Sequence, residues 1–188
     1  MIGIDEVGRG CWAGPLLVVA ARVKTLLPDG LKDSKKLTKK QRENLFEAIQ
    51  KSCDLGEGWV QPAEIDELGL TEAMKLAVFR ALNALQAKSE EEIIMDGTFN
   101  YVPDTYTNVK CLAKADDLYP LVSAASIYAK VKRDTYMSTE AHQQFPAYSF
   151  DLHVGYGTAL HIAALKLYGV TTIHRLSYKP IKVFVETV

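Results

Sequence analysis

The sequence predicts an α/β fold, in which a central mixed β-sheet is flanked by helices and followed by a small C-terminal helical portion. Short apolar, β-branched runs alternate along the chain with longer segments whose apolar residues recur at helical spacing. Two of these runs end in an acid followed closely by glycine, which is typical of a buried strand with charge at its tip. The 188 residues are most simply one domain, able to bury roughly 70% of the unfolded surface.

The first half of the chain supplies three predicted strands and two predicted helices. The strands are expected at 1–6, 16–23 and 56–60. Thr38 is placed to N-cap a helix that runs to about Ser52. Pro62 and the acids after it mark the start of another helical stretch, and Gly69 is expected to separate it from a longer helix ending near Lys88.

The second half supplies two further strands and several helices. Strands are predicted at 93–97 and 109–113. Helices are predicted at 120–137, before Phe145-Pro146 and at 157–168, and the helical part of the domain is expected to cover about 140–188. One side of the helix at 120–137 carries small residues that permit close approach to a neighbouring element: Ser123, Ala124, Ser126 and Ala129.

The composition is that of an ordinary globular protein, which we expect to be cytoplasmic. A net charge of -1 argues against a nucleic-acid coat protein but not against a nucleic-acid enzyme, whose metal-binding acids offset its basic residues. The three cysteines form no C-x-x-C pair, so we expect reduced thiols. Met1 leads into the first strand without a basic leader, and the longest apolar run, 16–21, is too short to span a bilayer.

Acidic residues occupy three places where an apolar strand ends or a helix is about to begin. Asp5 and Glu6 close the first strand, Asp96 ends a later strand, and Asp116 precedes a helix. An unpaired carboxylate is costly to bury, so acids rarely end apolar strands by accident. Mg²⁺ or Mn²⁺ would neutralise them, because these hard cations prefer oxygen ligands. Two such ions roughly 3.5–4 Å apart can activate water and stabilise the leaving oxygen in phosphodiester hydrolysis.

Strand geometry limits what the first two acids can do together. Successive side chains of a strand point to opposite faces, so Asp5 and Glu6 both point inward only if the strand has ended. We therefore expect Asp5 to be the central bridging ligand, with Glu6 acting from the start of the turn or through its backbone carbonyl. Any one acid alone is more simply a helix cap or a salt-bridge partner. For Asp117, which suits an N-cap, that simpler interpretation is preferred.

The glycine loop after the first strand has two interpretations. Gly8 and Gly10 allow positive φ and close approach of bare backbone to a ligand, which suits a phosphate or sugar site beside a metal site. The stretch 8–13 also matches the G-x-G-x-x-G/A pattern of dinucleotide-binding proteins. That second interpretation is disfavoured, because Gly14-Pro15 and a β-branched run follow where a helix should begin.

Taken together, the motifs resemble those of ribonuclease HII, the type 2 ribonuclease H. The block Gly3-Ile4-Asp5-Glu6-Val7-Gly8-Arg9-Gly10 resembles the D-E-x-G-R-G signature that opens that family. Further blocks follow in family order over nearly the whole chain: 33–37, 96–97, 114–116, 123–127, 130–131, 133–134, 153–156 and 174–178. The chain departs from the family at Cys11-Trp12, where small or aliphatic residues are usual, and at Tyr178, which replaces a commoner Phe.

The resemblance implies an RNase H-like catalytic domain over 1–188 and metal-dependent cleavage of the RNA strand in RNA–DNA hybrids. It also implies incision 5′ to single ribonucleotides embedded in duplex DNA, which leaves 3′-hydroxyl and 5′-phosphate ends. Two Mg²⁺ or Mn²⁺ ions are implied, held by the catalytic acids Asp5, Glu6, Asp96 and Asp116. Asp116 is preferred to Asp117 because it directly follows the Lys-Ala pair. Nothing points to an obligate protein partner, and we expect a monomer.

The resemblance also implies which residues hold the nucleic acid. The Gly8-Arg9-Gly10 loop would read the ribose 2′-hydroxyl, since backbone groups can both donate to it and accept from it. Tyr156 would pack on the sugar next to the ribonucleotide, although without the family context it could equally be an aromatic before the next helix. Ser34, Lys35 and Lys36 would hold phosphates, whereas spacing alone favours a charged surface loop. Weaker candidates of the same kind are Lys114, Lys130, Arg175 and Lys179.

Two other functions are compatible with parts of the pattern. A non-catalytic module that binds RNA–DNA hybrids would keep the fold, but it would gain nothing from four carboxylates near phosphates. A related metal nuclease for branched DNA would cut without reading ribose, and cleavage of an all-DNA duplex would identify it. The four histidines show no ligand spacing, and we assign none of them to a metal.

Overall fold

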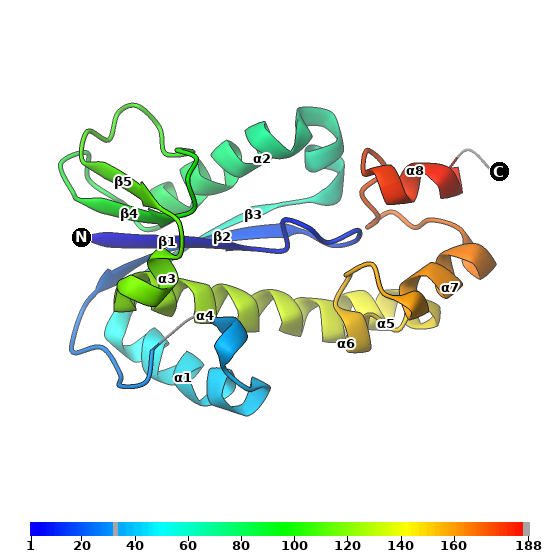
Figure 1. The fold of residues 1–188 in the computed structure, drawn as a ribbon, viewed down its shortest axis with the longest axis horizontal. Coiled ribbons are helices and arrows are strands. Elements are labelled where there is room, and N and C mark those ends of the chain that lie inside the picture. Colours follow the sequence, from blue (N-terminus) through cyan, green and yellow to red (C-terminus); the bar gives the residue numbers. More distant parts are fainter. Residues whose placement is uncertain (32–33, 186–188) are drawn as a thin grey trace. The chain divides into compact units, whose positions relative to one another are not determined.

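A mixed sheet of five strands organises the chain, which confirms the predicted α/β class. The computed structural model describes residues 1–31 and 34–185, with the backbone alone for Lys35. The strand order in the sheet is β3-β2-β1-β4-β5 (Figure 1). The strands are β1 (Ile2–Val7), β2 (Leu16–Val23), β3 (Cys53–Val60), β4 (Ile93–Asp96) and β5 (Val109–Leu112). β1 runs antiparallel to β2 and parallel to β4, and β4 runs parallel to β5.

The helices follow the predicted order, with three short additions. The α-helices of the described chain are α1 (Lys39–Ser52), α2 (Pro62–Ala84), α3 (Ala115–Leu118), α4 (Pro120–Tyr136), α5 (His142–Gln144), α6 (Phe150–His153), α7 (Ala159–Tyr168) and α8 (Lys179–Val185). A 3₁₀ turn at Ser34–Lys36 precedes α1, a π-helical turn at Met137–Ala141 follows α4, and a second 3₁₀ turn lies at Pro146–Tyr148. The sequence pattern did not predict α3, α6 or α8.

Two predicted helix signals are confirmed in detail. Thr38 caps α1 by accepting a hydrogen bond from the Gln41 amide at 3.3 Å, and the Gln41 side chain accepts one from the Thr38 amide at 2.9 Å. This reciprocal arrangement satisfies amides that the helix leaves unbonded at its first turn. Gly69 interrupts α2 with φ 74° and ψ 159°. α2 ends at Ala84, earlier than the predicted end near Lys88.

The described chain divides into two compact units. The first, here called the sheet unit, consists of Met1–Val7, Leu17–Trp59 and Met74–Val131. The second, here called the C-terminal unit, consists of Gly8–Leu16, Val60–Ala73 and the chain from Lys132 onward. Each unit is thus assembled from segments that are distant in sequence.

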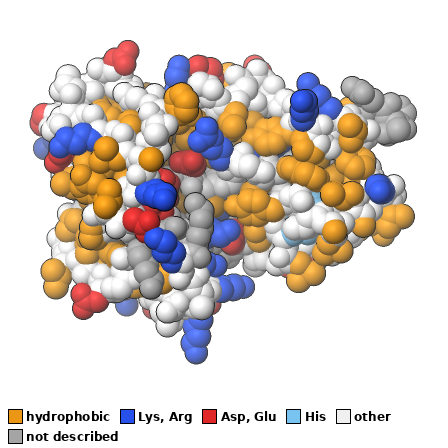
Figure 2. Space-filling model, viewed as in Figure 1, with side chains coloured by type: hydrophobic (Ala, Val, Ile, Leu, Met, Phe, Trp, Pro, Cys, Tyr) orange, Lys and Arg blue, Asp and Glu red, His pale blue; other side chains and the backbone are white. Residues whose placement is uncertain are grey.

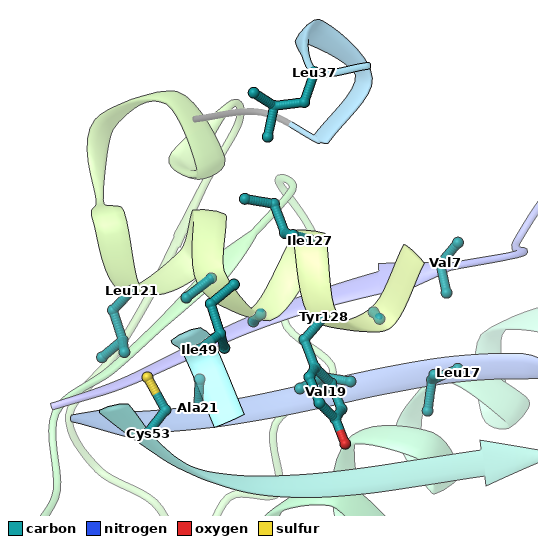
Figure 3. Packing of buried hydrophobic residues seen from close by; sticks show 13 residues of the cluster. Val7, Leu17, Val19, Ala21, Leu37, Ile49, Cys53, Leu121, Ile127 and Tyr128 are labelled. Carbon is teal, nitrogen blue, oxygen red and sulfur yellow. The ribbon is translucent and has the colours of Figure 1, made fainter. Parts of the chain in front are cut away.

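The core of the sheet unit lies between the sheet and two helices. Side chains from one face of β1 and β2, such as Val19 and Ala21, pack against Ile49 of α1 and Ile127 of α4 (Figure 3). The part of α2 from Met74 onward, which belongs to the sheet unit, covers the opposite face of the sheet (Figure 1). There a Cβ at Gly58 of β3 would overlap with the carbonyl oxygen of Ala77, so glycine permits the helix to approach the strand.

The surface carries both signs of charge. On the face drawn in Figure 2, Lys and Arg side chains lie beside Asp and Glu side chains, in keeping with the net charge of -1. Within the part of the chain that the structure describes, each helix is too short or too polar to cross a membrane.

Candidate active site

Two predicted acids lie side by side on neighbouring parallel strands of the sheet unit. The register pairs Ile4 of β1 with Met95 of β4, so Asp5 and Asp96 occupy the next pair of positions. Asp5 is only 6% exposed. Burial raises the pKa of its carboxyl group well above the usual range, and the charges of Glu6 and Asp96 raise it further. The sheet therefore places a costly concentration of negative charge at one point.

Ser126 of α4 connects Asp5 to the segment predicted to hold phosphates. Its hydroxyl forms a hydrogen bond with the Asp5 carboxylate that lowers the pKa of Asp5, against the larger effect of burial. A second hydrogen bond, 3.0 Å long, joins the hydroxyls of Ser126 and Ser34. Both serines are buried. Sequence reasoning treated Ser126 only as a small residue, although it lies in a block that resembles the family.

The prediction that Glu6 acts from the start of the turn is wrong. β1 continues in regular register through Glu6 to Val7, so the strand has not ended where the turn was predicted to begin. On a regular strand the side chains of Asp5 and Glu6 point to opposite faces. Glu6 is partly exposed and acts on Asp5 through its charge and through its amide, which donates to Asp5 Oδ1 at 2.8 Å.

The third acidic position is tied to the second through the start of α3. The amide of Ala115 donates to Asp96 Oδ1 at 2.7 Å. Asp116 follows directly and is 6% exposed, and its backbone carbonyl accepts a hydrogen bond from the Ser123 hydroxyl at 2.5 Å. Lys114, before the helix, adopts the left-handed conformation with φ 62°, which few residues other than glycine take without cost. Asp116 is thus the residue after the one whose amide binds the Asp96 carboxylate, which holds the two acids near each other.

Asp117 is a salt-bridge partner and not the N-cap that its position suggested. It lies inside α3, and its Oδ1 is 2.5 Å from Lys36 Nζ. The partly exposed pair contributes little to stability, about 0–1 kcal/mol. Lys36 was predicted to hold a phosphate; the predicted Lys35 side chain lies outside the described residues, as does Asp33.

The acids fit a divalent cation in their donor chemistry. They offer hard carboxylate oxygens, and a cation would remove the penalty that burial and mutual repulsion impose on Asp5. Within residues 1–31 and 34–185, however, no three His, Cys, Asp or Glu side chains are arranged so that they could hold one metal ion. The Asp5 and Asp96 carboxylates instead accept hydrogen bonds from the amides of Glu6 and Ala115.

The glycine loop belongs to the C-terminal unit. Gly8 has φ 84°, and a Cβ there would overlap with Arg133 Nε. Arg9 and Gly10 are exposed, and the Arg9 carbonyl accepts a hydrogen bond from the Tyr178 hydroxyl at 2.7 Å. Between β1 and β2 the chain forms no helix, which removes the dinucleotide-binding interpretation, because that requires a helix N-terminus at the loop.

Tyr156 lies in the turn between α6 and α7 of the same unit. Its side chain is 38% exposed, and burial, reinforced by Cys11, raises its pKa to about 12. Thr158 caps α7 by accepting from the His161 amide at 3.3 Å, so the cap of this helix does not depend on Tyr156. The ring is available in part to a ligand.

Three of the four histidines are buried together next to this turn, and two of them form a chain of hydrogen bonds. The Thr171 amide donates to His174 Nδ1 at 2.9 Å, so His174 carries its proton on Nε2 and donates to His161 Nε2 at 2.9 Å. His161 then donates from Nδ1 to the Tyr156 carbonyl at 3.0 Å. The ring of His153 stacks on His161 with centroids 4.5 Å apart. Burial lowers the pKa of His161 to about 4 and that of His174 to about 3.

Arg175 was predicted, as a weaker candidate, to bind phosphate, but its guanidinium is not available on the surface. The side chain is 0% exposed. It donates to Gly14 O from Nε and Nη2 at 3.1 and 2.9 Å, and to Arg9 O from Nη1 at 3.1 Å. The same Nη1 donates to the Tyr178 hydroxyl at 2.9 Å. Arg175 therefore supports the glycine loop from within.

Comparison with known proteins gives one consistent result. A family model described as Ribonuclease HII matches residues 2–181. A protein named Ribonuclease HII from Delftia acidovorans is 42% identical over 183 residues, which cover 95% of this chain and 75% of that protein. Another of that name from Shewanella halifaxensis is 43% identical over 96% of this chain and 88% of its own length. The crystal structure of ribonuclease H2 from Pyrococcus horikoshii is similar with a TM-score of 0.78 and 29% identity, covering 98% of this chain and 96% of that one.

Proposed function

The chain belongs to the ribonuclease HII family and is a ribonuclease H nuclease, and from this premise we propose which bonds it cuts. It hydrolyses the RNA strand of RNA–DNA hybrids and incises duplex DNA on the 5′ side of a single embedded ribonucleotide, leaving 3′-hydroxyl and 5′-phosphate ends. The observation that carries the proposal is the pairing of buried Asp5 with partly exposed Asp96 on parallel strands, with Asp5 linked through Ser126 to Ser34.

The proposed catalytic acids are Asp5, Glu6, Asp96 and Asp116. Asp5 is the central ligand, because it is buried between Glu6 and Asp96, whose charges add to the penalty for its own. The carboxylates of Asp5, Asp96 and Asp116, with Glu6 acting through its backbone carbonyl, would hold two divalent ions, Mg²⁺ or Mn²⁺. Such ions would supply a water of lowered pKa and neutralise charge that develops on the scissile phosphate. Ser126 holds Asp5 by its hydroxyl, and the Ala115 amide holds Asp96. These contacts restrict both carboxylates before substrate binds.

Phosphate contacts are proposed for Ser34, Lys35 and Lys36. Ser34 is hydrogen-bonded to Ser126, which in turn is hydrogen-bonded to Asp5. This position suits a contact to the phosphate nearest the cut. Lys36 would exchange its weak ion pair with Asp117 for a phosphate oxygen. Contacts of this kind carry no sequence information, so affinity should fall as salt rises.

Recognition of the ribonucleotide is assigned to the C-terminal unit. The Gly8-Arg9-Gly10 loop would read the 2′-hydroxyl, supported by the exposure of Arg9 and Gly10 and by the hydrogen bonds that fix the Arg9 carbonyl. Tyr156 would pack on the neighbouring sugar with the part of its ring that is exposed. We propose that the enzyme acts as a monomer in the cytoplasm.

Cleavage of two matched duplexes tests the proposal. One carries a single ribonucleotide and the other is all DNA, and each is incubated with Mg²⁺, with Mn²⁺ and with EDTA. Metal-dependent incision only of the first duplex, on the 5′ side of the ribonucleotide, is expected. Cleavage of both would remove the role of the glycine loop. Binding of an RNA–DNA hybrid without any cleavage would overturn the catalytic assignment.

A further inference from the structure

Arg133 is a buried arginine whose guanidinium, within the described part of the chain, donates to backbone carbonyls of the C-terminal unit. The side chain is 0% exposed. Nε donates to Pro15 O at 2.8 Å and Nη2 to Ala13 O at 3.0 Å, both in the segment that continues the glycine loop. Nη1 donates to Val154 O at 2.9 Å, two residues before Tyr156. One side chain thus joins the loop segment to the tyrosine turn.

The two segments also touch each other directly beside this arginine. The amides of Trp12 and Ala13 both donate to Gly155 O, at 2.8 and 3.3 Å. A Cβ at Gly155 would overlap with the carbonyl oxygen of Ala13, and φ there is 88°. A hydrogen bond between the Tyr156 hydroxyl and the Cys11 thiol adds a side-chain link. The backbones of the two segments therefore lie in direct contact, and the distance between them depends on the groups that hold them together.

Only arginine has the geometry for this contact. Its planar guanidinium presents donors in a fixed fork, so one side chain can bond three carbonyls that face it from different directions. A lysine ammonium in the same place is a point donor and cannot span acceptors on both segments in the same way. Burying the cation is costly unless its donors find acceptors, and each of its three nitrogens donates to one of the three carbonyls.

Arg175 provides a contrast within the same unit. It is equally buried, but its hydrogen bonds go to Gly14, to Arg9 and to the Tyr178 hydroxyl. It therefore holds the loop without reaching the turn that carries Tyr156. Arg175 thus supports the loop alone, whereas Arg133 supports both the loop segment and the turn.

We propose that Arg133 is a positioning residue that sets the spacing between the Gly8-Arg9-Gly10 loop and Tyr156. With that spacing fixed, the loop and the tyrosine act on adjoining sugars of one strand at the same time. This role in recognition rests on the proposed function, whereas the role in fixing the two segments rests on the hydrogen bonds alone. Comparing the variants R133K and R175K distinguishes this positioning role of Arg133 from general support of the loop.

Amide hydrogen exchange measured by NMR tests the structural part without any substrate. In R133K the amides of Trp12, Ala13 and Tyr156 should exchange on the order of tenfold faster or more, because the segments open locally. In R175K the Tyr156 amide should keep its wild-type rate. Amides of β1 and β4 serve as the control for global unfolding. If R133K fails to fold, G155A forces the same segments apart through its added methyl group and should raise the same exchange rates. Unchanged exchange in R133K, or in G155A where that variant replaces it, overturns the proposal.

A double-mutant cycle with Y156A tests the part that concerns recognition. The readout is kcat/KM on the duplex with one ribonucleotide. If Arg133 acts through Tyr156, the double variant R133K/Y156A should be within about twofold of Y156A, whereas the losses in R175K/Y156A should multiply. Multiplying losses for R133K contradict the proposal. If the wild-type enzyme does not incise this duplex, the proposed function fails, and the exchange experiment still decides the role of Arg133.

Discussion

The buried histidine chain should make the protein less stable in mild acid. In the folded protein the pKa of His161 is lowered to about 4 and that of His174 to about 3, against about 6.5 for an unfolded chain. Protons therefore bind the unfolded chain more tightly, and the free energy of unfolding falls as the pH drops below about 6.5. His153 shifts in the same direction, also through burial.

The size of the loss follows from these pKa values. Between pH 7 and pH 5 each of His161 and His174 should remove about 2 kcal/mol, so together they remove roughly 3–4 kcal/mol, a large part of the stability of a typical domain. The loss begins near the unfolded pKa and continues below pH 5, because both folded pKa values lie lower still. Asp5 works in the opposite direction, since its raised pKa favours proton uptake by the folded state.

Urea unfolding at pH 7 and pH 5 measures the effect. The wild type is compared with the double variant H161Q/H174Q, so that contributions from Asp5 and other carboxylates cancel in the difference. The variant is expected to lose about 3 kcal/mol less than the wild type over this interval. Equal losses in the two proteins would refute the argument that these imidazoles are neutral because they are buried.

Three further substitutions test other parts of the structure. Asp96→Asn should leave hybrid binding, measured by fluorescence anisotropy in EDTA, near the wild-type value but reduce cleavage at least about 100-fold; cleavage at the wild-type rate would contradict the site. Tyr178→Phe removes the hydroxyl that bonds Arg9 O, and should cost about 1 kcal/mol of stability and lower incision at a single ribonucleotide more than cleavage of a long hybrid. Gly58→Ala should lower the free energy of unfolding by about 2–3 kcal/mol, because the methyl group would overlap with Ala77 O; a melting temperature like the wild type would show that α2 can move away.

Much of the fold could be predicted because its signals are local. Thr38 and Gln41 stand at the spacing of a capping box, and Gly69 breaks a helical pattern, so both features follow from residues a few positions apart. The pairing of Asp5 with Asp96 also followed from a local pattern, since each acid lies at or near the end of an apolar strand. The helix α8 was not predicted, because the polar and basic segment 174–180 that leads into it shows no apolar periodicity.

The rest depended on contacts between distant residues. Ser126 is a small residue in a helical pattern, and only the fold brings its hydroxyl to Asp5 and Ser34. Arg175 has the composition of a surface cation but is buried against carbonyls far away in sequence. Asp117 was assigned to a cap because the helix start was placed too late, whereas α3 already begins at Ala115.

The division of the chain into interleaved segments also orders events during synthesis. The sheet unit is complete once Val131 has been made, so Asp5, Asp96 and Asp116 can assemble while the ribosome is still translating. The hydrogen bond to the Arg9 carbonyl, by contrast, cannot form until Arg175 has been made, 166 residues later. At ordinary elongation rates this is a delay of roughly 10–30 s. A stalled or prematurely released chain would therefore contain the three acids without the hydrogen bond from Arg175 that holds Arg9 O, so on the proposed roles it would have the catalytic acids before the loop that reads ribose.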